Sequence, residues 1–296
     1  MPTDWISEIY AGAEMADVKG DVSLTLTSGK FGRVFGGNKT SGILDGSITV
    51  NIQENGSCDV PLVIGELYGG GNMAAYSIYG FEGTAPRTKA QYDALTAEQK
   101  AAIELEQPHA SPVVNVHGFT SIGNIFGGGF GADAKMYGNP TVNINEVMVE
   151  GNKAYQFAND QSTNKPTELI DGENVKLHDH VVGNMGVINN VFGGGNAALV
   201  DGNTTVNIAT EENVYVVKLV DVGNSVTGLY KRVKNETTGV VSYELQSSAT
   251  DKAVEGSNYY QKQTVVGADI RGNVYGGGNE AEVTGNTNVV IGKRSE

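Results

Sequence analysis

The hydrophobic residues of this chain recur in two short motifs that alternate along the sequence. The first motif reads aliphatic, aromatic and then glycine, and it occurs at residues 34–38, 67–72, 125–129, 191–196 and 274–279. The second motif is a short stretch of alternating aliphatic and polar positions at residues 49–52, 113–116, 141–144, 205–208 and 288–291. Alternation with a period of two predicts β-strands, and self-similarity on this scale predicts a repeat architecture.

The spacing between the two motifs is nearly constant except in copy two, where a long insertion lengthens it to 46 residues from Tyr68 to Val114. From the aromatic residue to the first valine of the next strand there are 15 residues from Phe35 to Val50, 16 from Phe126 to Val142, and 14 in the last two copies. Residues 20–26 have the pattern of the second motif without a first motif before them. The array is therefore expected to begin in mid-repeat. Because it breaks off after a strand without a polar cap, a fragment of a longer protein is expected.

One such repeat cannot bury its hydrophobic face alone, but repeats stacked one strand spacing apart pair their backbones and enclose a continuous core. The sequence therefore predicts an all-β fold, a right-handed parallel β-helix (β-solenoid) that forms a single domain over residues 1–296. The right hand follows the general preference of parallel crossovers. Val50, Ile52 and their equivalents should point inward, and Asn51, Asn143 and Asn207 should form an outward column.

The first motif contains the residues that are expected to have structural roles in each repeat. Its glycines should lie at a corner where the chain needs either a positive φ or close approach of stacked backbones. A phosphate-binding loop is disfavoured, because no Lys-Ser/Thr follows the glycines. The asparagines after them should form a hydrogen-bonded ladder. The repeat positions are the aromatic residues Phe35, Tyr68, Phe126, Phe192 and Tyr275 and the asparagines Asn38, Asn72, Asn196 and Asn279.

Three insertions interrupt the repeats, at about residues 80–111, 145–187 and 209–270. In the first insertion, Thr88 and the Thr96–Gln99 pair are N-cap signals, and they predict two short helices. The apolar residues of these helices are expected to pack onto the stack; they are Tyr92, Leu95, Ile103 and Leu105.

The third insertion carries two strand-like stretches, residues 229–233 and 240–245, on either side of a polar turn. This pattern predicts a β-hairpin. Insertions in repeat proteins often lie on the face that binds ligands. The candidate binding residues are therefore the tyrosines of this insertion, Tyr230, Tyr243, Tyr259 and Tyr260.

Composition narrows the classes of partner. The chain carries a formal net charge of −14 without a large basic cluster, which disfavours nucleic acid. Charged residues are only 18 % of the chain, a composition common in extracellular β-proteins. Cys58 is the sole cysteine, so intramolecular disulfides are excluded and a buried small side chain is expected. Residues 1–20 lack the pattern of a signal peptide or a membrane span, so any export signal would lie outside this sequence.

Candidate metal ligands and catalytic carboxylates are sparse. His178, Asp179 and His180 could converge on a transition metal, against the simpler interpretation of a solvated loop. Residues 128–133 match the calcium-repeat unit GGxGxD once, which leaves Ca²⁺ as an alternative to the expectation of no cofactor. The carboxylates considered for hydrolysis are Asp45 with Asp201, Glu280 with Glu282, and Asp171 with Glu173, and surface charge explains each of them more simply.

Residues 272–293 and 189–208 resemble the glycine-rich repeats of large secreted or surface proteins of gut Bacteroidetes, often described as adhesin-like. The resemblance covers the repeat cores, less than half of the chain. It implies a right-handed β-helix, an extracellular or cell-surface location and a role in adhesion, and it carries over no catalytic residues.

We therefore expect a non-enzymatic, adhesin-like or structural module, monomeric, that displays loops to a glycan or a surface protein. One alternative is a carbohydrate-active β-helix enzyme, a polysaccharide lyase or glycoside hydrolase. A second alternative is a structural protein of a fibre or phage tail.

Overall fold

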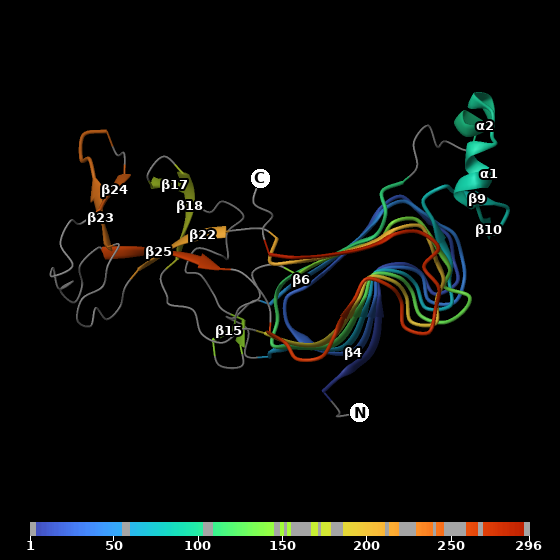
Figure 1. Cartoon of the computed structure of the whole chain (residues 1–296), viewed down its shortest axis with the longest axis horizontal. Coiled ribbons are helices and arrows are strands. Elements are labelled where there is room, and N and C mark those ends of the chain that lie inside the picture. The colour runs from blue at the N-terminus through green and yellow to red at the C-terminus, as the bar shows by residue number, and fades with distance from the viewer. Residues whose placement is uncertain are drawn as a thin grey trace.

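The computed structural model describes residues 4–54, 60–102, 109–144, 149–150, 153–154, 167–170, 173–178, 186–210, 213–218, 229–238, 241–245, 259–265 and 269–292. It is mostly β-structure with two short helices. Figure 1 looks along a stack of parallel strands, with the helices on one side of the stack and a group of inserted strands on the other.

The first sheet collects the strands that contain or precede the glycine motif. Its members are β1 (Ile6–Tyr10), β4 (Gly29–Phe35), β7 (Leu62–Tyr68), β12 (Ser121–Phe126), β19 (Val187–Phe192), β26 (Asp269–Ile270) and β27 (Val274–Tyr275). All of its strand pairs are parallel and in register from one repeat to the next.

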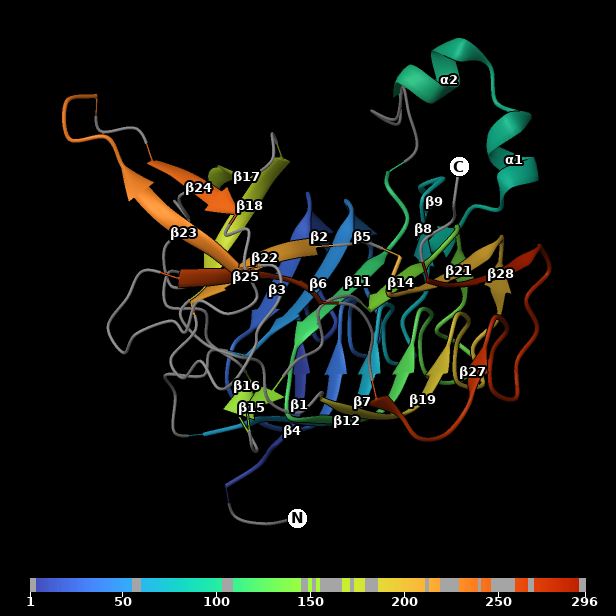
Figure 2. The same ribbon diagram turned by 60° about the vertical axis from the view of Figure 1, so that its left-hand side comes forward.

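The second sheet contains the strands of the second motif. Its members are β3 (Val22–Leu26), β6 (Ile48–Gln53), β11 (Val113–Gly118), β14 (Thr141–Ile144), β21 (Thr204–Ile208) and β28 (Thr287–Ile291), again all parallel. Short parallel strands connect the two sheets: β2 (Val18–Lys19), β5 (Leu44–Asp45), β8 (Tyr76–Ser77), β13 (Met136–Tyr137) and β20 (Val200–Asp201). Figure 2 shows the two main sheets from the side.

Each passage of the chain through the first and then the second sheet is called a layer. The structure has six layers, with second-sheet strands β3, β6, β11, β14, β21 and β28 in layers one to six. The sequence predicted only half a repeat at the start of the array, and this was wrong. Strand β1 completes layer one, with Tyr10 paired to Phe35, although Ala11 replaces the first glycine of the motif.

The core follows the two-residue period of the second motif. Val50, Ile52, Val142 and Ile144 are fully buried, as predicted, because alternate residues of a strand point to opposite faces. The aromatic residues form a second, separate cluster. Their rings stack in one column with centroids 4.8 Å apart and planes within 12° of parallel, in the order Tyr10, Phe35, Tyr68, Phe126, Phe192 and Tyr275.

Close approach of backbones explains the glycines of the first motif. A Cβ atom on Gly69 would lie 2.4 Å from the carbonyl oxygen of Gly127, and one on Gly127 would lie 2.3 Å from that of Gly193. The glycines with positive φ in the described residues all lie outside the motif. Of the two reasons expected for these glycines, tight stacking between layers is therefore the one that applies.

Asparagine ladders run along the outside of the stack. Asn115 donates to Asn51, Asn143 to Asn115 and Asn207 to Asn143, each over 2.9–3.0 Å from Nδ2 to Oδ1. This outward column confirms the predicted orientation. Because a buried or partly buried amide needs a partner, each side chain in the ladder satisfies the next.

The ladder expected after the glycines forms only in part. Asn279 Nδ2 donates to Asn196 Oδ1 at 3.0 Å, but Phe130 stands between Asn72 and Asn196. Asn38 does not belong to this column. Its carbonyl accepts from Asn72 N, as the Gly195 carbonyl accepts from Asn279 N, so Asn38 takes the level of the third glycine. The missing glycine of copy one causes this shift.

The predicted helices of the first insertion are present. α1 (Lys89–Asp93) has a capping box in which Thr88 and Gln91 bond reciprocally, and α2 (Ala97–Ala102) has the same arrangement at Thr96 and Gln99. A short hairpin, β9 (Phe81–Glu82) with β10 (Ala85–Pro86), precedes them. Strands β15 (Val149–Glu150) and β16 (Lys153–Ala154) form another small hairpin in the second insertion.

The second and third insertions join in one six-stranded sheet. Its order is β17 (Thr167–Ile170), β18 (Glu173–His178), β22 (Asn213–Lys218), β25 (Tyr259–Val265), β23 (Leu229–Lys234) and β24 (Val241–Leu245). The antiparallel pairing of β23 with β24 confirms the predicted hairpin. The two insertions meet where β18 pairs in parallel with β22. Cys58 lies outside the described residues.

Candidate functional site

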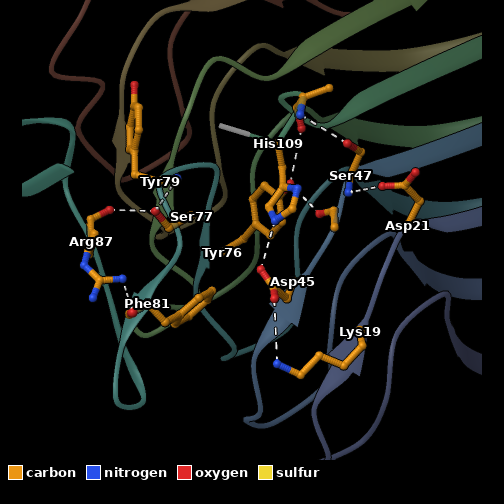
Figure 3. Close-up of polar contacts among 12 residues, drawn as sticks. Lys19, Asp21, Asp45, Ser47, Tyr76, Ser77, Tyr79, Phe81, Arg87 and His109 are labelled. Carbon is orange, nitrogen blue, oxygen red and sulfur yellow. Dashed lines mark hydrogen bonds and ion pairs between the residues drawn. The ribbon is translucent and has the colours of Figure 1, made fainter. Parts of the chain in front are cut away.

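A cluster of polar side chains lies where the first insertion returns to the stack. The insertion leaves after β8, and at its base the His109 backbone N–H donates to the carbonyl of Ile78 at 3.1 Å. His109 then faces the corner formed by the short strands of layers one and two (Figure 3). We call this cluster the insertion corner; it consists of Lys19, Asp21, Asp45, Ser47, Tyr76 and His109.

Asp45 links three layers at the insertion corner. Its Oδ1 lies 2.9 Å from His109 Nε2, and its Oδ2 lies 3.7 Å from Lys19 Nζ. Lys19 belongs to layer one, Asp45 to layer two and His109 to the insertion of layer three. Asp45 and His109 are partly exposed, so the contact fastens the insertion to the stack at a solvent-accessible place.

Tyr76 secures the same corner from inside. Its hydroxyl donates to the Gly46 carbonyl at 2.7 Å and lies 3.2 Å from the Ala110 carbonyl. Burial raises the pKa of Tyr76 far above its ordinary value, and the carboxylates of Asp21 and Asp45 raise it further. The phenol therefore stays protonated at neutral pH and acts as a hydrogen-bond donor.

Ser47 connects two further segments. Its hydroxyl oxygen accepts from the Ala110 N–H at 3.1 Å, while its own backbone N–H donates to Asp21 Oδ1 at 2.7 Å. Through its hydroxyl and its backbone N–H, Ser47 connects Asp21 of layer one and its own layer two to the returning insertion. These contacts are structural.

A second set of contacts orients the outer part of the insertion. The Ser77 hydroxyl donates to the Arg87 carbonyl at 2.6 Å and accepts from the Tyr79 N–H at 3.0 Å. The Tyr79 and Tyr92 rings lie 5.8 Å apart, and both side chains are buried. Tyr92 and the partly buried Leu95 pack against the core, as predicted. Ile103 and Leu105 lie outside the described residues.

Asp45 and Asp201, the first two carboxylates considered for hydrolysis, are too far apart to act as a pair. Asp45 and Asp201 belong to layers two and five, and three strand spacings of about 4.8 Å separate them by roughly 14 Å along the stack. Glycosidic hydrolysis needs two carboxyl groups about 5–10 Å apart. Asp201 Oδ1 accepts from Thr284 Oγ1 at 2.7 Å, and Glu280 and Glu282 are exposed.

The backbone register places the candidate tyrosines on the inserted sheet. Tyr230 lies directly opposite Tyr260, and Tyr243 lies opposite Arg232, two residues after Tyr230. Tyr259 is the residue before Tyr260 on the same strand.

The predicted metal ligands are placed only in part. His178 is the last residue of β18, whereas Asp179 and His180 lie outside the described residues, as does Asp171. Glu173 begins β18, and Asp133 of the GGxGxD unit is exposed. Across the part of the chain that the structure describes, no three His, Cys, Asp or Glu residues gather closely enough to hold a metal ion.

Known proteins offer no guide to this site. No protein family, curated protein or solved structure matches the chain. Within the described residues, no helix is long and apolar enough to span a membrane.

The contact of His109 with Asp45 was not predicted from the sequence, because the two residues are 64 positions apart and meet only through the path of the insertion.

Proposed function

We propose that the protein is a right-handed parallel β-helix that works as a non-enzymatic, adhesin-like module at the cell surface or outside the cell. In this role its insertions bind a glycan or a surface protein. The observation that carries the proposal is the joint sheet of the second and third insertions, which leave from adjacent layers and pair through β18 and β22. A stack that supports such an extra sheet offers a rigid base for a binding surface.

The first insertion lies on the other side of the stack from the joint sheet (Figure 1), and the insertion corner attaches it there. Asp45, Tyr76 and Ser47 each hold the returning segment near His109, so the helices are attached at a defined place on the stack. The groups that could act as acids, bases or nucleophiles at this corner are engaged in these contacts. The separation of Asp45 from Asp201 also counts against a carbohydrate-active enzyme.

The resemblance of the repeats to adhesin-like proteins of gut Bacteroidetes agrees with this proposal, as does the low content of charged residues. Binding of host or bacterial surface ligands would use the joint sheet of the second and third insertions. The stack would then set the spacing and orientation of those insertions.

The proposal is tested by trimming the insertions. Layer one is joined to layer two by only three residues, Thr27, Ser28 and Gly29, between Leu26 of the second sheet and Lys30 of the first sheet. Replacing residues 145–186 and 209–268 each with this three-residue link should keep the β-sheet circular dichroism signal and abolish binding on a glycan array and to intact cells. The matched control replaces residues 78–112 with the Gly-Asn-Pro link of residues 138–140 and should keep that binding. If the doubly trimmed protein binds as well as the whole chain, the proposal is wrong.

A further inference from the structure

Two aspartates at equivalent positions of the stack have different surroundings. Asp45 of layer two and Asp201 of layer five each end a short connecting strand and precede a glycine. Asp45 lies within ion-pair distance of two basic groups, Lys19 and His109. Among the described residues, no basic side chain pairs with Asp201: its Oδ1 accepts from Thr284 Oγ1 at 2.7 Å, and its Oδ2 makes no hydrogen bond. Because a partly buried charge is costly without a partner, Asp201 is a place where a cation would bind favourably.

A buried hydroxyl without a partner belongs to the same side of the stack. Tyr79 is only 8 % exposed, and within the described part of the chain its hydroxyl makes no hydrogen bond. The backbone N–H of Tyr79 is bonded to the Ser77 hydroxyl, but its ring points away from Ser77 and from the insertion corner (Figure 3). Since buried hydroxyls almost always have a hydrogen-bond partner, this one is expected to bond a group that comes from outside the chain.

The strand register places Tyr79 close to Asp201. Ser77 pairs with Tyr137, and Tyr137 pairs with Asp201, so these three residues form one column along the stack. Ile78, the residue before Tyr79, donates its backbone N–H to the Tyr137 carbonyl at 3.0 Å. The backbone at Tyr79 is therefore held two strand spacings from the level of Asp201, about 10 Å along the stack. A tyrosine side chain that points along the column spans much of this distance.

The charges that act on the Tyr79 hydroxyl favour a cation. Burial raises the pKa of Tyr79, the Lys89 ammonium lowers it, and the carboxylates of Asp93 and Asp201 raise it again. The phenol is therefore neutral at neutral pH, and its oxygen can accept a hydrogen bond. Lys89 and Asp93 form an ion pair four residues apart within α1, so they neutralise each other. The charge that remains beside the hydroxyl is the carboxylate of Asp201.

We propose that Asp201 and Tyr79 bind the ammonium group of a small organic amine at the base of the first insertion. An ammonium group has three donors and no acceptor, so it suits a carboxylate oxygen and a phenol oxygen that both lack a partner. A metal ion fits less well, because no three His, Cys, Asp or Glu residues gather closely across the described residues. The site lies on the first insertion and not on the joint sheet, so this proposal goes beyond the proposed function.

A saturation-transfer NMR titration tests the site with two probes, n-butylamine and glucosamine. Both carry an ammonium group at neutral pH, and the two titrations distinguish an alkyl amine from an amino sugar as the source of that group. At least one of them should bind the whole chain. N-butylacetamide, the neutral counterpart of n-butylamine, should bind about tenfold more weakly or not at all, because it lacks the charge that Asp201 recognises.

Variants of the two residues test the assignment. Asp201→Asn and Tyr79→Phe should each weaken amine binding by about tenfold or more, because each removes a hydrogen bond to a charged group. Asp133→Asn is the matched control: it removes the same charge from an exposed position in layer four, and it should bind the amine normally. Asp201→Asn changes a solvent-accessible side chain, so it keeps the test decisive even if Tyr79→Phe lowers the melting temperature.

Three results would overturn the proposal. If neither amine binds at millimolar concentration, the Tyr79 hydroxyl bonds only to water. If Asp133→Asn weakens binding as much as Asp201→Asn, the amine is attracted only by the net charge of −14. If Tyr79→Phe folds and binds as well as the unchanged chain, the hydroxyl has no part in the site. Replacing residues 145–186 and 209–268 should leave amine binding intact, so this proposal and the proposed function can fail independently.

Discussion

Replacing the central glycine of the motif by alanine should have opposite effects inside the stack and at its end. In layer four, a Cβ on Gly128 would lie 2.8 Å from Gly195 N, 2.9 Å from Gly195 Cα and 3.1 Å from Val200 Cγ2. Two of these atoms are backbone and cannot move without shifting layer five. Overpacking of this kind costs about 1–3 kcal/mol. At Gly277 the same change meets nothing within 4 Å.

The substitution also affects the unfolded chain, and this effect changes the free energy of unfolding in the opposite direction. Alanine restricts the unfolded backbone more than glycine, which stabilises the folded state by about 0.4–1 kcal/mol where the native conformation allows it. The net expectation is a loss on the order of 1–2 kcal/mol for Gly128→Ala and a gain of a few tenths to about 1 kcal/mol for Gly277→Ala. Urea denaturation of each variant beside the unchanged chain measures both. Equal effects at the two sites would refute the conclusion that close stacking, and not turn conformation, requires these glycines.

Three further perturbations follow from the same contacts. Phe126→Ala should lose roughly 3–5 kcal/mol in urea denaturation, because it removes a buried ring between two stacked neighbours; a loss below about 1 kcal/mol would contradict this. Asp45→Asn should speed proteolytic cleavage of the first insertion without changing the melting temperature of the stack, and unchanged cleavage would show that the His109 contact does not fasten the insertion. Burial raises the pKa of Tyr10 to about 12, with the Glu8 carboxylate adding to the effect. Because the folded pKa exceeds the unfolded value of about 10, the stability it contributes is complete below pH 10 and lost as pH rises through 12. Denaturation midpoints across this range should fall less steeply for Tyr10→Phe, and identical slopes would refute the assignment.

The repeated strands could be predicted because their evidence is local. Val50 and Ile52 alternate with Thr49 and Asn51, and the same alternation recurs at fixed distances, so period and repetition support one another. Burial of the valine and isoleucine positions and the outward asparagine ladder follow from that pattern alone.

The errors at the start of the stack have equally local causes. Layer one was missed as a complete repeat because Ala11 and Ala13 stand where later copies have glycine or asparagine, so no motif is visible there. Asn38 was assigned to the wrong column because copy one lacks a glycine. Only the hydrogen bond from Asn72 N to the Asn38 carbonyl reveals the shift of one level.

The contacts made by the insertions depend on the path of the chain and not on local pattern. The hairpin of β23 and β24 was predicted because its strands are neighbours in sequence, separated by one turn. The pairing of β18 with β22 joins two different insertions, and the contact of His109 with Asp45 joins two layers. Because the partners in these contacts are far apart in the sequence, no periodic pattern predicts them.

The physical demands on the stack explain where variation is tolerated. A residue of the glycine motif is constrained by the layers on both sides, since Gly127 is limited by Gly193 and Gly69 by Gly127. A substitution there disturbs a contact that is repeated along the whole column. The links between the second and first sheets carry no such constraint, because three residues suffice in layer one while layers four and five accommodate long insertions at the same place. Specific recognition, which requires a surface unlike its neighbours, is therefore expected to depend on these links, and the stability of the stack is expected to depend on the layers.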